Sequence, residues 1–511
     1  MPAKAPKTAR HLEVERKFDV VESTVSPSFE GIAAVARVDK SPVQELDAVY
    51  FDTTAQDLAR NRITLRRRTG GHDAGWHLKL PAGADARTEV HAPIDASDDA
   101  DTVPAGLLDV VLAIVRDRPV QPVARITTRR ESQILYDAGG TALAEFSNDH
   151  VTAWSAANGS DAGPAEQRWR EWEVEVLDTD SDKKRSAGHE LLNRLSNRLM
   201  DAGASPAAHG SKLSRVLDSD GPAKASAAPP ADPVHRAVAQ QVEQLLVWDR
   251  AVRADAHDSV HQMRVTIRKI RSLLKDSQDS FGLADGAWVL DELRELAGIL
   301  GVARDAEVLA ERYERQLSSL TPDLVRGPVT ERLVNGAQRR YQLGLRRSLA
   351  AMRSKRYFRL LDALDAMVAE PPVAALGQEP RPVTIDAAYK RVRKATKAFK
   401  AAEAAQADDA DETLHVIRKR AKRLRYTASA TGASQVAQQA KAIQTLLGDH
   451  QDSVVSREHL LAQAHAAHVA GEDTFTYGLL YERENEIAET SREQLDLALR
   501  KLDKAVHKKR H

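Results

Sequence analysis

The chain has 511 residues, of which 42% are hydrophobic and 29% charged, and this length predicts two or three globular domains. It contains no cysteine, which excludes disulfides and thiolate metal sites and fits the cytoplasm, where we expect the protein. Lys plus Arg equals Asp plus Glu at 74 each, so an anion-binding surface must come from local segregation of charge. No stretch approaches the roughly 20 apolar residues that cross a bilayer.

The pattern of hydrophobic residues divides the chain into two parts. Residues 1–10 are short and basic, and we expect a disordered tail there. Residues 11–217 contain short segments that alternate residue by residue, which is typical of strands. Residues 218–233 are rich in Ala, Pro and Asp and predict a linker. Residues 234–511 show helical spacing of 3.6, so we predict an α+β multidomain protein with a β-rich N-terminal domain and an all-α C-terminal domain.

Several predicted strands carry a row of charges on one face. A single such strand is usually a solvated edge, but many of them are explained better by a closed barrel whose lumen they line. Carboxylate rows confined in a lumen repel one another by several kcal/mol at an effective dielectric near ~20, unless a cation lies between them. Carboxylate oxygens suit Mg²⁺ or Mn²⁺, and Arg and Lys suit phosphate oxygens. The rows are Glu13, Glu15 and Lys17; Arg66 and Arg68; His77 and Lys79; and Glu171, Glu173 and Glu175.

An ordered series of motifs accompanies these rows. EVERKF contains Glu13, Glu15 and Lys17 and is followed by YFDT, LRRR, WHLKLP, RRES, LAEF, EVEV and GSKLSR. Over residues 11–216 this series resembles the CYTH family of triphosphate tunnel metalloenzymes. The resemblance implies an eight-stranded antiparallel tunnel in which a metal-activated water attacks the terminal phosphorus of a linear triphosphate.

The resemblance also assigns roles to individual residues. It implies metal ligands at Glu13, Glu15, Glu145, Glu173 and Glu175 and a phosphate clamp of Lys17, Arg66, Arg68, Lys79, Arg130 and Lys212. The catalytic set it implies is Glu13, Glu15, Lys17, Glu173 and Glu175. The roles of Glu89 and Asp149 stay open: Glu89 is of uncertain register, and a longer loop over residues 146–150 makes Asp149 a turn residue rather than a ligand. Trp76, Trp169 and Trp172 are predicted to pack on the outer wall.

The C-terminal part contains an internal duplication. SVHQMRVTIRKIRSLLK (259–275) aligns with TLHVIRKRAKRLRYTAS (413–429), so that His261 matches His415 and Arg264 matches Arg418. In both segments the cations recur on one helical face and apolar residues lie opposite. A second pair, LAGILGVARD and IQTLLGDHQD, follows at similar distance. The duplication predicts two similar helical bundles around a pseudo-twofold axis, over about 234–370 and 383–511.

This pattern resembles the CHAD family of helical domains. The resemblance implies binding of inorganic polyphosphate along a basic groove, which is compatible with association with polyphosphate granules. A solvated helix face is the simpler reading of one such stripe, but two matched stripes with few acids favour a polyanion. The implied binding residues are His261, Arg264, Arg268, Lys269, Arg271, His415, Arg418, Lys419, Lys422, Arg423 and Arg425.

Four functions are compatible with these residues. The leading hypothesis is a Mg²⁺- or Mn²⁺-dependent inorganic triphosphatase whose helical domain binds polyphosphate. A second keeps the tunnel but acts on thiamine triphosphate or nucleoside triphosphates, including cyclisation of ATP. A third is a non-enzymatic polyphosphate-binding or granule protein, which the carboxylate rows disfavour. The fourth is nucleic-acid binding, for which the helices show no groove-reading motif.

Overall fold

The computed structural model describes residues 9–83, 85–94, 102–155, 166–177, 182–217, 232–278, 281–283, 287–369, 385–405 and 410–510. The expected tail therefore lies outside the described residues up to residue 8, and the expected linker lies outside them up to residue 231. The chain forms two compact units. One comprises residues 1–277, 285–294 and 349–372, and the other comprises 278–284, 295–348 and 373–511.

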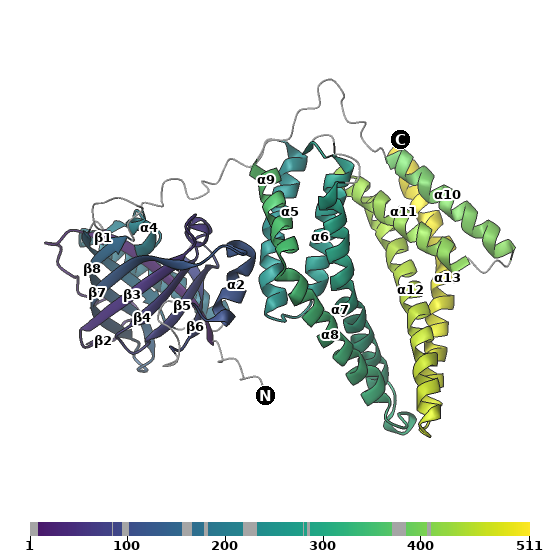
Figure 1. Ribbon diagram of the computed structural model, residues 1–511, viewed down its shortest axis with the longest axis horizontal. Coiled ribbons are helices and arrows are strands. Elements are labelled where there is room, and N and C mark those ends of the chain that lie inside the picture. The colour runs from purple at the N-terminus through teal and green to yellow at the C-terminus, as the bar shows by residue number, and fades with distance from the viewer. Residues whose placement is uncertain are drawn as a thin grey trace. The chain divides into compact units, whose positions relative to one another are not determined.

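The N-terminal strands form a closed antiparallel barrel of eight strands, as the sequence predicts (Figure 1). The order around the barrel is β1-β6-β5-β4-β3-β7-β8-β9, and β9 pairs with β1 to close it. The strands are β1 (Ala9–Val20), β3 (Gln44–Asp52), β4 (Thr64–Thr69), β5 (Gly75–Pro81), β6 (Ala86–Ala92), β7 (Gln121–Tyr136), β8 (Ala142–Ser155) and β9 (Glu166–Val176). Two short strands lie outside the ring: β2 (Arg37–Lys40) pairs with β7, and β10 (Ser205–Pro206) pairs with β1.

Strand β1 closes the barrel by pairing with β6 over its first half and with β9 over its second half. Its residues 9–14 pair with β6, and residues 14–20 pair with β9. It begins at Ala9, so the last two residues of the expected tail belong to the barrel. Past Val14, one further backbone bond joins the β6 side of β1 to the described residues of the β5–β6 hairpin, from Glu15 N to Asp85 O at 3.0 Å. The next partners on that side are residues 205–207, where Ala207 N donates to Lys17 O at 3.0 Å.

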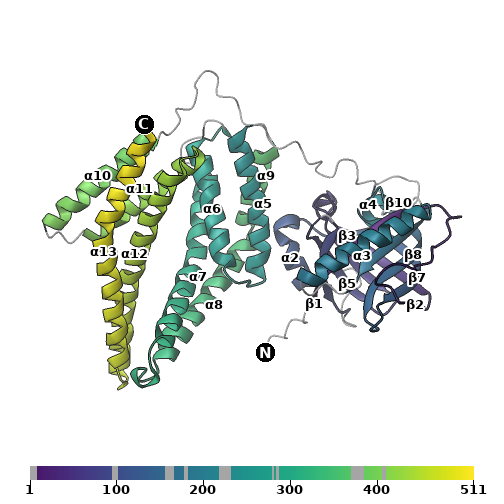
Figure 2. The ribbon, with the colours of Figure 1, turned by 180° about the vertical axis from the view of Figure 1, so that it is seen from behind.

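Two helices cover the outer wall of the barrel. Helix α3 (Asp182–Asp201) lies along β1 and β9, and its Leu195 packs with Trp172 (Figure 2). Helix α2 (Ala105–Val115) packs its Leu107 and Val111 against Trp76 and the outward residues of β4 to β6. The period-two alternation thus places apolar side chains outward beneath helices and leaves the charged rows for the lumen.

A short helix closes one end of the lumen. Leu213 and Val216 of α4 (Lys212–Val216) pack against inward-facing residues of β3, β7 and β8, including Tyr50 and Ile126. Trp169 lies with this cluster and donates its Nε1 to Glu171 at 2.6 Å. The prediction that Trp169 packs on the outer wall is therefore wrong, because Trp169 shares the parity of the acidic row on β9.

The C-terminal part is helical, as predicted. Its elements are α5 (Pro233–Arg253), α6 (Ser259–Asp276), α7 (Trp288–Ser318), α8 (Gly336–Met352), α9 (Lys355–Ala369), α10 (Ile385–Ala404), α11 (Ala410–Ala430), α12 (Ser434–Val469) and α13 (Phe475–Arg510). Short helical turns η2 (Pro322–Leu324) and η3 (Glu331–Asn335) complete this part, and the short helix α1 (Asp57–Arg60) lies between β3 and β4 of the barrel. Among the described residues, no helix is both long and apolar enough to span a membrane.

The duplicated helices bury the faces that the alignment predicts. Met263, Ile267, Ile270 and Leu274 of α6 are fully buried, and so are Ile417, Ala421, Leu424 and Ala428 of α11. Helix α11 packs against α10 and α12, and the buried residues of these helices and the end of α13 form one core.

Candidate functional site

The barrel brings the predicted metal and phosphate residues into one lumen. Cross-strand pairs place Glu15 opposite Glu175, and Lys17 opposite Glu173. Lys79 on β5 reaches Glu13 on β1 at 2.6 Å. Lys17 contacts Glu15 at 3.1 Å and also contacts Glu173. The alternation of side chains along each strand was therefore sufficient to group these residues, because residues two positions apart point to the same face of the sheet.

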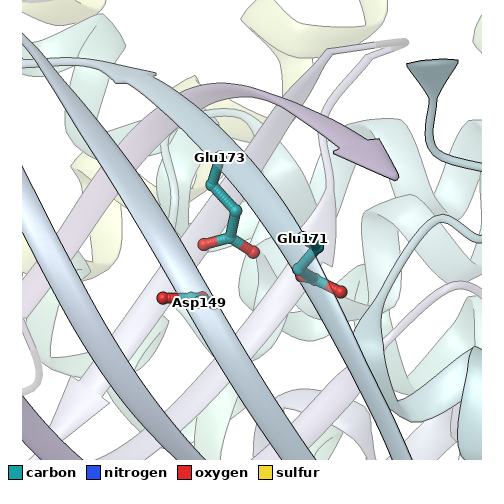
Figure 3. Close-up of side chains that lie close together, drawn as sticks. All are labelled: Asp149, Glu171 and Glu173. Atoms are coloured by element: carbon teal, nitrogen blue, oxygen red, sulfur yellow. The ribbon is translucent and has the colours of Figure 1, made fainter. Parts of the chain in front are cut away.

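A second acidic group lies deeper, beside α4. Carboxylate oxygens of Asp149, Glu171 and Glu173 lie within 4.8 Å of one another (Figure 3). The ammonium of Lys212 contacts all three, at 2.8, 2.7 and 2.7 Å. Arg130 donates two hydrogen bonds to Asp149 at 2.8 and 2.7 Å and one to Glu173 at 2.6 Å. The protein's own cations thus neutralise this group.

The turn assignment of Asp149 was wrong. Residues 146–150 lie inside β8, and Asp149 is fully buried opposite Arg130 and Glu171. Asn148 and Asp149 favour turns locally, but pairing on both sides of β8 overrides that preference. Glu171 was recognised only as part of an acidic row and was not among the predicted site residues. The contact with Lys212 reveals its place in the site.

The carboxylates at the other side of the lumen are less completely neutralised, because Lys79 and Lys17 are shared among Glu13, Glu15 and Glu175. Burial and the charge of Glu13 raise the pKa of Glu175 to about 8. Burial, opposed by Lys79, and the charges of Glu89 and Glu15 raise the pKa of Glu13 to about 7. Burial alone would raise the pKa of Glu15, but Lys17 and Lys79 lower it to about 2. Glu13 and Glu175 therefore share a region with excess negative charge, which a divalent cation would relieve.

The donor type of these carboxylates fits a hard divalent cation, whereas among the described residues only Asp149, Glu171 and Glu173 bring three ligand oxygens within 4.8 Å of one another. Glu13, Glu15, Glu145 and Glu175 offer only carboxylate oxygens, and Glu145 pairs across the sheet with Glu175. Oxygen-only ligands suit Mg²⁺ or Mn²⁺ rather than zinc. The group of Asp149, Glu171 and Glu173 is geometrically close enough to hold an ion, but Lys212 already contacts all three of its carboxylates.

A small cavity lies among the cations of the lumen, of which Arg130 and Lys212 also contact the acidic group and Arg68 contacts Asp73. A cavity of about 20 Å³, enough for a single water molecule, is lined by Arg66, Arg68, Arg130 and Lys212 and by no acidic residue. Burial and the neighbouring Arg66 and Arg130 lower the pKa of Arg68 to about 9. Arg66 donates a hydrogen bond to Tyr50 at 3.2 Å. Four cations around one small cavity form a cradle for an anion.

Glu89 also faces the lumen, which settles its register. It pairs across the sheet with Lys79, and its Oε1 lies 2.8 Å from His77 Nδ1. The other nitrogen of His77 lies 3.0 Å from Asp73 O. Burial, with the charges of Arg66 and Arg68, lowers the pKa of His77 to about 4. Both partners of His77 are acceptors, so a neutral ring donates to only one of them at a time.

The predicted cations of the helical part are not equivalent. Arg271 of α6 donates to Leu290 O at 3.1 Å, and Arg425 at the matching place in α11 donates to Gln444 at 2.9 Å. These two arginines join neighbouring helices. Arg268, Lys269, Lys419 and Arg423 are exposed, and Arg264, Lys422, Arg418, His261 and His415 are half-buried.

Arg418 lies across α12 because Gly448 leaves room for it. A Cβ at Gly448 would be only 3.2 Å from Arg418 Nη2. The nearby Asp452 has a pKa raised by burial, against the charges of Arg418 and Arg312. Nδ1 of His415 is buried and forms no hydrogen bond with the described residues.

Sequence reasoning missed one basic surface. Helix α10 carries six cations between residues 390 and 400 and no acid among them. Lys390, Arg391, Arg393, Lys394 and Lys397 are exposed. The run KRVRKATKAFK was the available signal, but it has no counterpart in the first repeat, where the exposed residues of α5 are Gln240, Glu243, Gln244 and Val247.

Comparison with known proteins supports the two-part organisation. A model of the CYTH domain matches residues 11–205, and a model of the CHAD domain matches residues 236–461. Two proteins from strains of Mycobacterium tuberculosis, both described as uncharacterized, are 71% identical over 518 aligned positions and cover all of both chains.

Solved structures match each part separately. PptA from Streptomyces chartreusis is 22% identical, with TM-score 0.41, over 53% of this chain and 99% of its own. The CHAD domain of Ricinus communis is 22% identical, with TM-score 0.38, over 54% of this chain and 93% of its own. A Hippeastrum protein described by a dominant triphosphatase activity is 17% identical, with TM-score 0.24, over 41% of this chain and 95% of its own.

Proposed function

Because this chain belongs to the proteins that join a CYTH domain to a CHAD domain, we propose that its tunnel hydrolyses inorganic triphosphate and that its helical part binds polyphosphate. The observation that carries the first half is the convergence of incompletely neutralised carboxylates and a cluster of cations in one lumen. Burial and neighbouring negative charge raise the pKa values of Glu13 and Glu175. A small cavity in the same lumen is lined by Arg66, Arg68, Arg130 and Lys212. A complex of a divalent cation with a phosphate chain neutralises both at once.

The residues of the lumen have different roles in the proposed reaction. Glu13, Glu15, Glu145 and Glu175 would hold Mg²⁺ or Mn²⁺, which supplies charge neutralisation and an activated water when bound. Glu173, the fifth predicted ligand, contacts Lys17, Arg130 and Lys212 and would instead position these cations. Arg66, Arg68, Arg130 and Lys212 hold phosphate oxygens, and Lys17 and Lys79 keep Glu15 and Glu13 in place. Hydrolysis forms one P–O bond from water to the terminal phosphorus and breaks the bridging P–O bond. Orthophosphate and pyrophosphate leave, and the cations stabilise the charge that develops on the bridging oxygen.

Inorganic triphosphate is favoured over organic triphosphates by the lining of the cradle. The cavity residues are cations, small or aliphatic side chains, Thr128 and Tyr50. Tyr50 is hydrogen-bonded to Arg66 and only 4% exposed, so its ring offers no face for stacking a base. The cradle therefore recognises phosphate oxygens rather than an organic group.

Phosphate release from tripolyphosphate, ATP and thiamine triphosphate, each with Mg²⁺ and Mn²⁺, tests the proposed activity. Tripolyphosphate should give the highest kcat/KM, and the double variant Glu15→Gln, Glu173→Gln should abolish turnover. Arg68→Gln should lower kcat/KM on the order of a hundredfold, because one charged phosphate contact is lost from a buried site. Arg67→Gln changes the neighbouring residue, which points away from the lumen, and should be nearly silent. Equal loss in both arginine variants, or full activity in the glutamate double variant, would reject the site.

The helical part is proposed to bind polyphosphate through exposed cations of α6 and α11. The support is the repeated basic face, including Arg268, Lys269 and Arg423, opposite a buried apolar face. The exposed cations of α10 add further positive charge to the second repeat. Binding should weaken steeply with salt, as polyanion binding does. Salt-independent binding, or equal affinity for DNA of similar length, would contradict the assignment to polyphosphate.

A further inference from the structure

A pocket of about 610 Å³ opens beside the closed end of the barrel. It lies where β1 has left β6 and before β10 begins, and its walls come from β1, the β5–β6 hairpin, the start of β4, α3 and residues 206–214. Glu15 and Lys17, which face the lumen, line it as well. The pocket therefore shares Glu15 and Lys17 with the lumen and lies in the size range of ligand sites.

The cations of this pocket run from the lumen to the surface. Lys17 faces the lumen, with 17% of its side chain exposed. Arg87 is 19% exposed, donates to Gly210 O at 2.6 Å and lies 4.0 Å from Glu15. Arg62 is exposed at the rim. Of the acids in the lining, Asp85 already accepts two hydrogen bonds from Arg16, at 2.9 and 2.8 Å, and Glu15 contacts Lys17.

Arg62 occupies an unusual backbone position. Its φ is 57°, in the left-handed region, directly after the C-cap of α1. Gly or Asn usually takes this place, because a side chain with a Cβ is strained there. The strain is observed at a residue whose side chain lines the pocket, which points to a role for the guanidinium itself.

The pocket offers no aromatic face on which a base could stack, because Phe18 is its only Phe, Tyr or Trp and is 2% exposed. Beyond the charged residues already named, its polar lining consists of Thr64, three serines and His209, and apolar residues such as Ile63, Met200 and Leu213 complete it. The charged and polar part of this lining can bind phosphate oxygens.

We propose that this pocket, through Arg87 and Arg62, receives the part of a phosphate chain that extends past Lys17, so that the tunnel takes linear chains longer than three phosphates. The inference rests on the proposed function of the lumen. It adds a site that selects for the length of the phosphate chain at the closed end of the barrel. There α4 blocks the path along the barrel axis, and the pocket provides a path to the side.

The test compares tripolyphosphate with tetrapolyphosphate on the full-length protein with Mg²⁺ or Mn²⁺. Arg62→Gly removes the guanidinium and also relieves the backbone strain, so it should raise the melting temperature while lowering kcat/KM for the longer chain about tenfold relative to the shorter one. Arg60→Gln removes an exposed cation two residues away that does not line the pocket. It should leave unchanged the ratio of kcat/KM for tetrapolyphosphate to kcat/KM for tripolyphosphate. Met200→Trp fills the pocket without removing a charge and should lower the ratio in the same direction.

The outcomes separate this inference from the proposed function. An unchanged ratio in Arg62→Gly and Met200→Trp, with wild-type hydrolysis of tripolyphosphate, overturns the pocket and leaves the function intact. A selective loss of ATP turnover in these variants would also overturn it, because the pocket would then take an organic leaving group. If the wild type hydrolyses neither chain, calorimetric dissociation constants for both chains decide the matter. A preference for tetrapolyphosphate that Arg62→Gly removes supports the pocket, and equal affinities overturn it.

Discussion

Replacing Glu175 by Gln should stabilise the metal-free protein, although it removes a proposed metal ligand. Burial and Glu13 raise the pKa of Glu175 from 4.5 to about 8, so the folded chain binds a proton that the unfolded chain releases. Stability from this group is therefore present near pH 4 and is lost as the pH rises toward 8. At about 1.4 kcal/mol per pKa unit, the ionisable side chain costs the fold on the order of 4 kcal/mol near pH 8 and about 1 kcal/mol near pH 5.

Thermal unfolding of the chelated protein at the two pH values measures this effect. For a domain of this size a change of 4 kcal/mol corresponds to roughly 8–16 °C in Tm, so Glu175→Gln should unfold at a clearly higher temperature near pH 8 and at nearly the wild-type temperature near pH 5. Adding Mn²⁺ near pH 8 should raise the Tm of the wild type and have little effect on the variant.

Glu166→Gln provides the matched control. Glu166 lies on the same strand, but it is exposed and contacts Arg168 at 2.6 Å outside the lumen. This variant should behave like the wild type in every condition. If Glu175→Gln lowers the Tm near pH 8, or responds to Mn²⁺ as the wild type does, the excess negative charge assigned to that side of the lumen does not exist.

Three further changes probe other parts of the molecule. Lys212→Met should destabilise the barrel by about 3–5 kcal/mol in denaturant titrations, because it leaves three buried carboxylates without their shared ammonium; a loss under 1 kcal/mol would show that Arg130 suffices. The double reversal Arg264→Glu, Arg418→Glu should weaken polyphosphate binding and reduce its salt dependence in calorimetry, whereas Arg347→Glu on α8 should change both far less. Chelation should lower the wild-type Tm more near pH 8 than near pH 6, since metal competes with protons for the raised carboxylates; a constant difference would argue against this linkage.

Much of the lumen was predictable because a strand has only two faces. Once Glu13 faces inward, so do Glu15 and Lys17, and the same logic applies to Arg66 with Arg68. The buried faces of α6 and α11 were predictable for the same reason, with the helical period in place of the strand period.

What escaped prediction depends on pairing between distant strands. Asp149 looks like a turn residue until β7 and β9 are seen on its two sides, and Trp169 looks like a wall residue until α4 is seen inside the barrel. The exchange of partners along β1, which creates the lateral pocket, has no local sequence signal. Such features arise from tertiary closure, and local propensity carries no information about them.

Helix α4 closes the barrel with the same turn that carries Lys212. Leu213 and Val216 pack at the end of the lumen, and the adjacent Lys212 contacts three buried carboxylates. The packing of this plug and the neutralisation of the acidic group are therefore not independent. A substitution that displaces Leu213 would also move the ammonium away from its three partners.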